Sequence, residues 1–251
     1  MTALAWRVEQ ACLNAWPALR SAQHGDWLLR FGDGLSRRSN SVNPLHDRAG
    51  TIAADLDYFS KLYGDLGYPL IVRVPTLLTG VDQLNRELDQ HGFNVEGETC
   101  TLLRELGNES FATDSNATIA PEADAEWLSA IARLQAQSPS HAAIYARVVD
   151  AIALPTGFVA LRRDGVIVAT AYGVVSGDLL VVESVVVDAA LRGQGLGRRL
   201  MQALFGWGLS KGAQAVCLQV VADNTAGRAL YASLGFDREL YRYSYRRAET
   251  K

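Results

Sequence analysis

The stretch of sequence that decides the fold runs from Val185 to Met201 and reads VVVDAALRGQGLGRRLM. An apolar run, typical of a buried strand, leads into a glycine-rich turn, and the turn opens an amphipathic helix. The glycines from Gly193 to Gly197 allow the backbone amides of the turn to point to one place, together with the first amides of the helix. The stretch therefore predicts a site for a phosphate group. The apolar face of the helix consists of Leu196, Leu200, Ala203, Leu204 and Trp207.

Two cations in the first turn of this helix support the same prediction. Arg198 and Arg199 lie at the positive end of the helix dipole, where a cation costs up to roughly 1 kcal/mol unless an anion offsets it. Other phosphate loops fit poorly, because Arg198 replaces the third glycine of the dinucleotide fingerprint and no Gly-Lys-Ser/Thr is present. The alternative is a glycine-rich helix start with two surface arginines.

The segments around this turn predict a mixed α/β unit over residues 117–251. Three consecutive strands with short turns between them indicate an antiparallel meander ahead of the turn, and helix, strand, helix and strand follow. We therefore expect a central, largely antiparallel sheet flanked by helices. The predicted strands are 157–161, 166–175, 179–187, 216–221 and 241–246, with another near Thr118, and the predicted helices are 123–135, 141–153, 194–211 and 225–234.

Residues 107–116 are small and polar and predict a linker to an N-terminal α/β domain over residues 1–106. In that domain, Asp26–Phe31 and Leu35–Val42 predict a hairpin about Gly32-Asp-Gly34. If the second strand alternates, Arg37 lies on one face and Arg38 and Asn40 on the other, so polar groups line both sides. This half is predicted to enclose or read the acceptor substrate, with Arg37 and Asn40 as substrate-binding residues; an exposed hairpin is the alternative. The other predicted elements here are helices at 4–19, 51–66 and 81–91 and strands at 70–74 and 93–106.

Composition excludes several classes of protein. The 251 residues are 49% hydrophobic and carry 24 Lys and Arg against 27 Asp and Glu, a net charge of −3, so no cationic field favours nucleic acid. Cys12, Cys100 and Cys217 lie far apart and the histidines are isolated, which predicts neither a disulfide framework nor a metal site. We expect a cytoplasmic protein with no membrane partner, because neither a signal peptide nor an apolar stretch of about 18 residues is present.

Two motifs resemble those of one enzyme family. Arg192-Gly-Gln-Gly-Leu-Gly197 is similar to the Gln/Arg-x-x-Gly-x-Gly/Ala pyrophosphate motif of the GNAT superfamily of acyl-CoA-dependent N-acetyltransferases. The segment from Asn224 to Phe236 resembles that family's second signature, N-x-x-A-x-x-L-Y-x-x-x-G-F, with Gly227 where alanine is usual. This resemblance covers about residues 117–251. Trp27 to Val42 also resembles the G-W-x-x-R…R-x-N-S-V segment of two-part bacterial GNAT proteins, with Asp26 in place of its glycine.

The resemblance implies a GNAT fold, acetyl-CoA as the cosubstrate, and a degenerate GNAT-like N-terminal half without a cofactor of its own. It implies that the strand backbone pairs with the pantetheine arm, that residues 192–198 hold the pyrophosphate, and that Asn224 and Tyr231 lie near the thioester. Tyr231 is then expected to protonate the leaving thiolate, with a packed core tyrosine as the alternative. The predicted cofactor-binding residues are Val185, Val186, Val187, Arg192, Gly193, Gln194, Gly195, Leu196, Gly197, Arg198, Asn224 and Tyr231.

Glu183 is the second predicted catalytic residue. It stands in an apolar strand and is expected to point to the same side as Val185 and Val187. Burial raises the pKa of a carboxylate toward the range of a general base, which would take a proton from the attacking amine. A carboxylate that binds the substrate ammonium or an internal arginine is the alternative.

Together these residues predict an N-acetyltransferase that moves an acetyl group from acetyl-CoA to a primary amine of a small molecule or peptide, by direct attack in a ternary complex. Two alternatives stay open, a noncatalytic acyl-CoA-binding sensor and a protein N-acetyltransferase. Glu183 and Tyr231 together favour the enzyme, because a sensor needs only the loop. The sequence leaves the oligomeric state open.

Overall fold

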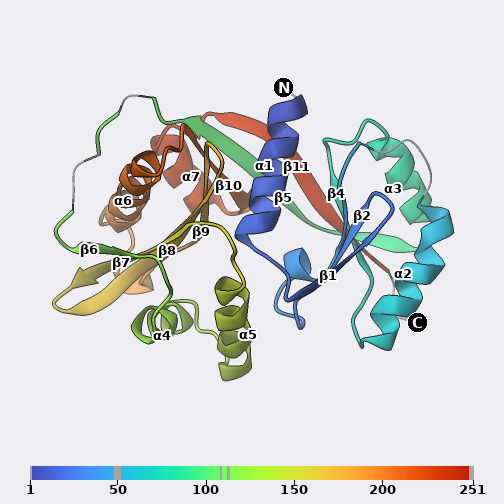
Figure 1. Cartoon of the computed structure of the whole chain (residues 1–251), viewed down its shortest axis with the longest axis horizontal. Helices are drawn as coiled ribbons and strands as arrows, with labels where there is room; N and C mark the ends of the chain where they lie inside the picture. The colour runs from blue at the N-terminus through green and yellow to red at the C-terminus, as the bar shows by residue number, and fades with distance from the viewer. Residues whose placement is uncertain (1, 48–51, 108, 112–113, 249–251) are drawn as a thin grey trace.

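A computed structural model describes residues 2–47, 52–107, 109–111 and 114–248 of the chain (Figure 1). The strands are β1 (Arg20–His24), β2 (Trp27–Phe31), β3 (Val42–Pro44), β4 (Ile71–Pro75), β5 (Phe93–Glu105), β6 (Ala117–Ala120), β7 (Thr156–Arg163), β8 (Val166–Ser176), β9 (Leu179–Val187), β10 (Ala215–Val221) and β11 (Arg238–Ala248). The α-helices are α1 (Thr2–Ala15), α2 (Ala53–Asp65), α3 (Val81–Gln90), α4 (Ala125–Leu134), α5 (Pro139–Asp150), α6 (Leu196–Ser210) and α7 (Thr225–Ser233), and the 3-10 helices are η1 (Arg37–Ser39) and η2 (Ala189–Leu191).

All of these strands belong to one sheet, in the order β1-β2-β3-β4-β11-β5-β10-β9-β8-β7-β6. In the part from β6 to β10, strands β7, β8 and β9 form the predicted antiparallel meander, β6 pairs antiparallel with β7, and β10 pairs parallel with β9. Residues of α1, α4 and α5 pack in one core on one face of this part, while α6 and α7 pack in a second core on the other. The predicted sheet, largely antiparallel and flanked by helices, is confirmed.

The last strand of the sequence lies inside the sheet rather than at its edge. β11 pairs antiparallel with both β4 and β5, and β5 in turn pairs with β10. In Figure 1, β5 and β11 run from one half of the molecule to the other, and α1 lies over the same region. Helix α1 comes from the N-terminal half of the sequence, yet it packs against β8, β9 and β10. The two halves therefore share both a sheet and a core, while their division at 107–116 stays a prediction.

The middle of β9 contains a β-bulge. Thr170 of β8 pairs with Val186 and Tyr172 pairs with Glu183, so two residues of β9 lie opposite the single residue Ala171. Ser184, one of these two, has a φ of 54°, in the left-handed region. The extra residue reverses the alternation of the strand, because side chains change face at every residue.

The prediction that Glu183 points to the same side as Val185 and Val187 is therefore wrong. Leu179 and Val181, which share the phase of Glu183, pack in the core with α1, whereas Val185 and Val187 pack in the core with α6. The strand therefore presents the carboxylate of Glu183 to one face of the sheet, and Val185 and Val187 to the other.

The predicted hairpin over 26–42 is wrong in its tight turn and in most of its second strand: β2 matches the first predicted strand, and it pairs antiparallel with β3 only from Val42 onward. Strand β2 forms its hairpin with β1, whose side chains are all exposed and so carry no apolar pattern. Residues 35–41 form a loop with one turn of 3-10 helix, and the strand begins only at Val42. The loop folds back so closely that a Cβ on Gly32 would lie 2.5 Å from Ser39 Oγ. The polar residues that suggested an alternating strand are used for hydrogen bonds within this loop.

Candidate active site

The first pocket lies on the α6 side of the sheet, and we call it the glycine-loop pocket. Its volume is about 570 Å³. It lies where the end of β9, the turn before α6 and the start of α7 meet, as the two sequence motifs suggest. Its lining is Val185, Val186, Val187, Leu191, Arg192, Gly193, Gly195, Leu196, Gly197, Arg198, Asn224, Ala226, Gly227, Leu230, Tyr231 and Ser233. All the predicted cofactor-binding residues except Gln194 are in this set.

The turn leaves its backbone open toward the pocket. Gly193 and Gly195 both have a φ of 77°, and a Cβ built on either would meet nothing within 4 Å. Gly195 is also the N-cap of α6, so the unpaired amides of the first helical turn follow directly. An acidic residue is absent from that turn, which leaves the positive end of the helix dipole without an internal counter-charge. The site therefore fits an anionic group such as a pyrophosphate.

The basic residues near this turn have different surroundings. Arg192 and Arg198 line the pocket, and Arg198 also donates a 3.0 Å hydrogen bond to Ser233 Oγ. Arg199 instead donates hydrogen bonds of 2.6 and 3.0 Å to the carboxylate of Asp114. Gln194 accepts a 3.1 Å hydrogen bond from Arg163 outside the pocket. Of the basic residues that the structure describes around the turn, Arg192 and Arg198 therefore remain for an anion bound there.

Two further predicted residues reach this pocket from the start and middle of α7. Asn224 caps the helix, because its Oδ1 accepts a 2.9 Å hydrogen bond from the Gly227 amide. Tyr231 is nearly buried against Phe236, with 5.8 Å between the ring centroids. Burial raises the pKa of Tyr231 to about 12, and the charge of Glu183 adds to the rise. The phenol therefore keeps its proton at neutral pH.

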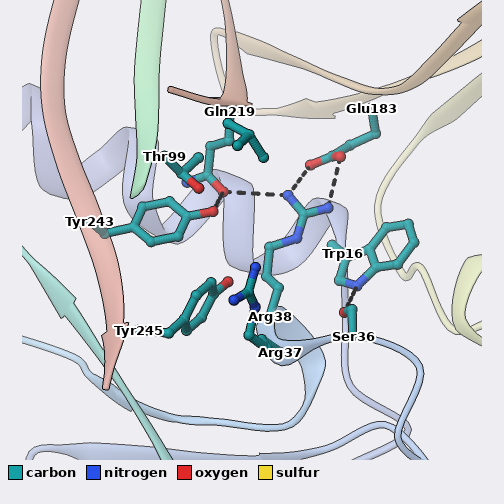
Figure 2. A pocket seen from close by; sticks show the side chains of 10 residues that line it. Trp16, Ser36, Arg37, Arg38, Thr99, Glu183, Gln219, Tyr243 and Tyr245 are labelled. Carbon is teal, nitrogen blue, oxygen red and sulfur yellow. Dashed lines mark hydrogen bonds and ion pairs between the residues drawn. The ribbon is translucent and has the colours of Figure 1, made fainter. Parts of the chain in front are cut away.

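The second pocket lies on the other face of β9, and we call it the ion-pair pocket (Figure 2). Its volume is about 250 Å³. It is built from the end of α1, the loop with η1, and residues of β5, β9, β10 and β11. The lining is Trp16, Ser36, Arg37, Arg38, Thr99, Glu183, Gln219, Val221, Tyr243 and Tyr245.

An ion pair between the two halves of the sequence stands in the wall of this pocket. Arg38 donates from both terminal nitrogens to both oxygens of Glu183, each at 2.8 Å, and the side chains are only 16% and 8% exposed. Arg38 also donates a 3.3 Å hydrogen bond to Gln219 and lies 4.8 Å from the ring centre of Trp16 (Figure 2). Burial alone would lower the pKa of Arg38, but the charge and hydrogen bonds of Glu183 outweigh burial and raise it.

The segment resembling two-part GNAT proteins positions Arg38. Arg30 donates 2.9 Å to the carbonyl oxygen of Arg38, and it also donates to the carbonyl oxygens of Leu13 and Trp16 at the end of α1. Burial, with the charge of Arg38, lowers the pKa of Arg30 to about 10. Arg30 thus holds the η1 loop against the end of α1.

The two predicted substrate-binding residues lie in different places. Asn40 is buried, and its side chain accepts from the amides of Gly32 and Gly34 at 2.9 and 3.2 Å and donates 2.8 Å to the Ser36 carbonyl. Those bonds occupy Asn40 within the loop and keep it out of the pocket lining. Arg37 does line the pocket, where it lies 5.1 Å from the ring centre of Tyr245 and donates 3.3 Å to Glu96.

Several residues of the ion-pair pocket were not predicted from the sequence to be part of a site. Trp16 has the apolar character of a core residue, and Thr99 and Gln219 lie in strands without any motif. Arg38 stood beside the residues chosen, but its partner Glu183 is 145 positions away, a separation that no local pattern reveals. The one available signal was the alternation of Tyr243 and Tyr245 in the last strand, which places both on the same face.

Strands β9 and β10 bring the two pockets together. Their parallel pairing covers Leu179–Val181 and Ala215–Cys217 and stops there. Beyond the paired part, β9 gives Glu183 to the ion-pair pocket and Val185–Val187 to the glycine-loop pocket. Likewise β10 gives Gln219 and Val221 to the ion-pair pocket. Asn224, which comes just after β10, lines the glycine-loop pocket. The two pockets thus lie on opposite faces of the sheet, beyond the point where β9 and β10 stop pairing.

This fold, with a glycine turn at the start of a helix beside an opened pair of parallel strands, defines a GNAT-type acyltransferase. The chain belongs to the family described as "Probable histone acetyltransferase Rv0428c C-terminal", whose model matches residues 2–246. The match includes both halves of the sequence, so the similarity to known proteins extends well ahead of residue 117.

Individual proteins similar to this chain are likewise described as N-acetyltransferases. The "Uncharacterized N-acetyltransferase YobR" of Bacillus subtilis (strain 168) is 25% identical over 242 residues, which is 92% of this chain and 93% of that protein. A GCN5-related N-acetyltransferase from Kribbella flavida has a TM-score of 0.71 at 17% identity and covers 100% of this chain and 96% of its own. A tandem GNAT protein from the clavulanic acid biosynthesis pathway has a TM-score of 0.68 at 14% identity, covering 97% and 88%. The two structures share the fold of this chain.

The described residues contain neither a candidate metal site nor a helix that could span a membrane. No cluster of three or more His, Cys, Asp or Glu side chains there is suited to a metal ion. Within the same residues, every helix is too short or too polar to cross a membrane.

Proposed function

We propose that this acyltransferase moves the acetyl group of acetyl-CoA to a primary amine of a small molecule or peptide. The observation that carries the proposal is the placing of two pockets on opposite faces of one strand, β9. The glycine-loop pocket has the open backbone and two arginines that suit a pyrophosphate. The ion-pair pocket supplies a carboxylate and aromatic walls for the amine. Acetyl-CoA would enter from the α6 side and the amine from the α1 side.

In the proposed reaction the neutral amine attacks the thioester carbonyl carbon in a ternary complex. A C–N bond forms and the C–S bond breaks, so the amine loses a proton and the departing thiolate needs one. We propose that Glu183 accepts the proton of the amine, once the amine has displaced Arg38 from one of its oxygens. Tyr231, which lines the glycine-loop pocket, would then protonate the thiolate. The products are the acetylated amine and free coenzyme A.

The pyrophosphate assignment is tested with two variants at one glycine. Asp and Asn both tolerate a left-handed φ, and the Cβ of either has open space at Gly193. Gly193→Asp adds a negative charge where the pyrophosphate is expected, whereas Gly193→Asn has nearly the same shape without the charge. Calorimetric titration with coenzyme A should show binding at least about 10-fold weaker for Asp than for Asn. Equal affinities would overturn the assignment.

A thiol-release assay with a panel of amines tests the reaction itself. Release of coenzyme A that depends on an added amine, with the acetylated amine found by mass spectrometry, supports the enzyme. Binding of acetyl-CoA without turnover on any amine, peptides included, would identify an acyl-CoA sensor instead. Turnover on lysine-containing peptides alone would identify a protein N-acetyltransferase.

A further inference from the structure

In the deeper part of the ion-pair pocket the charges of Arg38 and Glu183 match each other, while the more exposed Arg37 pairs with Glu96 outside the lining. Glu183 has both oxygens bonded to Arg38, and Arg38 has its remaining contacts with Gln219 and the face of Trp16. Tyr243 in turn donates 3.2 Å to the same oxygen of Gln219. The positive charge of Arg38 and the negative charge of Glu183 therefore balance in the deeper part of the pocket.

The charge balance restricts what is able to bind there. An amine that brings only a positive charge would take Glu183 from Arg38 and leave a guanidinium largely buried without an anion. A carboxylate alone would take Arg38 and leave Glu183 without a cation. Breaking a buried pair in this way is strongly unfavourable, because an uncompensated charge stays in a poorly solvated place. A molecule with both charges replaces each half of the pair at once.

The walls of the pocket suit such a molecule. A volume of about 250 Å³ equals the share of about eight water molecules in the liquid, enough for a small amino acid. Trp16, Tyr243 and Tyr245 give apolar surface for a side chain. The face of Trp16 lies 4.8 Å from the guanidinium of Arg38 and gives this cation a favourable contact in addition to Glu183.

We infer that the acceptor is a zwitterionic amine, a free amino acid or a close analogue, whose carboxylate pairs with Arg38 and whose ammonium pairs with Glu183. This inference rests on the proposed function, because it names the acceptor for that reaction. Arg38 becomes the residue that sets specificity. The ammonium lies against the carboxylate that would take its proton, and the carboxylate of the substrate holds it there.

Binding is measured first, because it does not depend on turnover. Each protein-forming L-amino acid is titrated calorimetrically into the protein saturated with coenzyme A. For every one that binds, its amide and its decarboxylated amine are titrated as well. We expect at least one amino acid to bind at least about 100-fold more tightly than both of its analogues. Equal binding of the amine, or no binding of any amino acid, would overturn the inference.

Two variants separate recognition from folding. Arg38→Gln removes the partner of the carboxylate, so the preference for the amino acid over its decarboxylated amine should fall by at least about 10-fold. The double variant Arg38→Gln/Glu183→Gln contains no unpaired charge at this place, and a thermal melt checks that it folds. It should bind acid, amide and amine with similar, weak affinity. A preference for the amino acid that survives in the folded double variant would contradict the inference.

The two proposals fail in different ways. Turnover of simple amines with no preference for a neighbouring carboxylate would keep the acetyltransferase and overturn the zwitterionic acceptor. Tight, Arg38-dependent binding of an amino acid without any release of coenzyme A would support the zwitterion site and overturn the proposed reaction. Tight binding together with acetylation of the same amino acid supports both.

Discussion

At the scale of single residues, the candidate site divides its chemistry between two side chains on opposite faces of the sheet. Glu183 is bonded to a cation that comes from 145 residues earlier in the chain. Tyr231 lies in the other pocket, where burial raises its pKa to about 12. In the proposed reaction the carboxylate receives a proton and the phenol gives one, so substitutions at the two positions should differ in their dependence on pH.

Tyr231→Phe deletes only a hydroxyl and keeps the packing against Phe236. We expect coenzyme A to bind normally while kcat falls roughly 100-fold, because the thiolate then leaves without a proton donor. The fall should be similar at every pH below about 12, since the phenol stays protonated over that range. Steady-state kinetics from neutral to alkaline pH measure both features.

The matched comparison is Glu183→Gln, whose kcat should fall most at neutral pH and recover as rising pH deprotonates the free amine. A fully active Tyr231→Phe enzyme would return Tyr231 to a packing role. A Glu183→Gln defect that is the same at every pH would remove Glu183 from the role of base. Thermal melts of both variants exclude unfolding as the cause of either loss.

At the scale of secondary-structure elements, the bulge in β9 decides which residues face which pocket. A regular strand would put Glu183 and Val185 on the same face, which is what alternation alone predicts. The extra residue comes at a cost, because Ser184 adopts a left-handed conformation that serine disfavours. A hydrogen bond of 2.9 Å from Tyr145 to Ser184 Oγ helps to hold it.

Substitutions at Ser184 separate these contributions. Ser184→Ala and Ser184→Gly both lose the hydrogen bond with Tyr145, but only glycine adopts a φ of 54° without cost. We expect the glycine variant to be more stable than the alanine variant by about 0.5–1 kcal/mol in denaturant unfolding. The same pair at Ser21, in the regular exposed strand β1, should show the opposite order. Alanine as the more stable residue at both positions would rule out a strained bulge.

The elements themselves were largely predictable, and the exceptions have physical reasons. β9 and its glycine turn follow from an apolar run and from glycines, which act locally. β1 has no apolar alternation because all its side chains are exposed, and the η1 loop imitates a strand because its polar residues bond to their own backbone. The ion-pair pocket could not be predicted from the sequence for a different reason. It joins α1, β5, β9, β10 and β11 through contacts that depend on the order of strands.

At the scale of the whole molecule, buried tyrosines link stability to alkaline pH. Burial raises the pKa of Tyr231 to about 12 and raises the pKa of Tyr63, Tyr145 and Tyr245 as well. An unfolded tyrosine titrates near pH 10. Above that pH the unfolded chain therefore loses protons that the folded chain keeps, which favours unfolding. The stability contributed by these phenols is complete below pH 10 and is lost as pH rises through their folded values.

We therefore expect the free energy of unfolding to fall steeply above about pH 10, by roughly 1.4 kcal/mol per pH unit for each tyrosine that remains protonated only in the folded state. Denaturant titrations at several alkaline pH values measure the slope. The Tyr231→Phe variant should show a smaller slope by one such contribution. A slope equal to that of the wild type would mean that Tyr231 titrates normally.

The position of β11 has a consequence for how the protein is made. The ribosome completes β4 and β5 long before it reaches residue 238, yet these two strands meet only through β11, which pairs with both. During translation the nascent chain therefore holds two strand edges that lack their final neighbour, and such edges are prone to pair with other chains. The sheet closes only after release of the last strand from the exit tunnel. The strand order thus confines the risk of wrong strand pairing to the time before β11 is made.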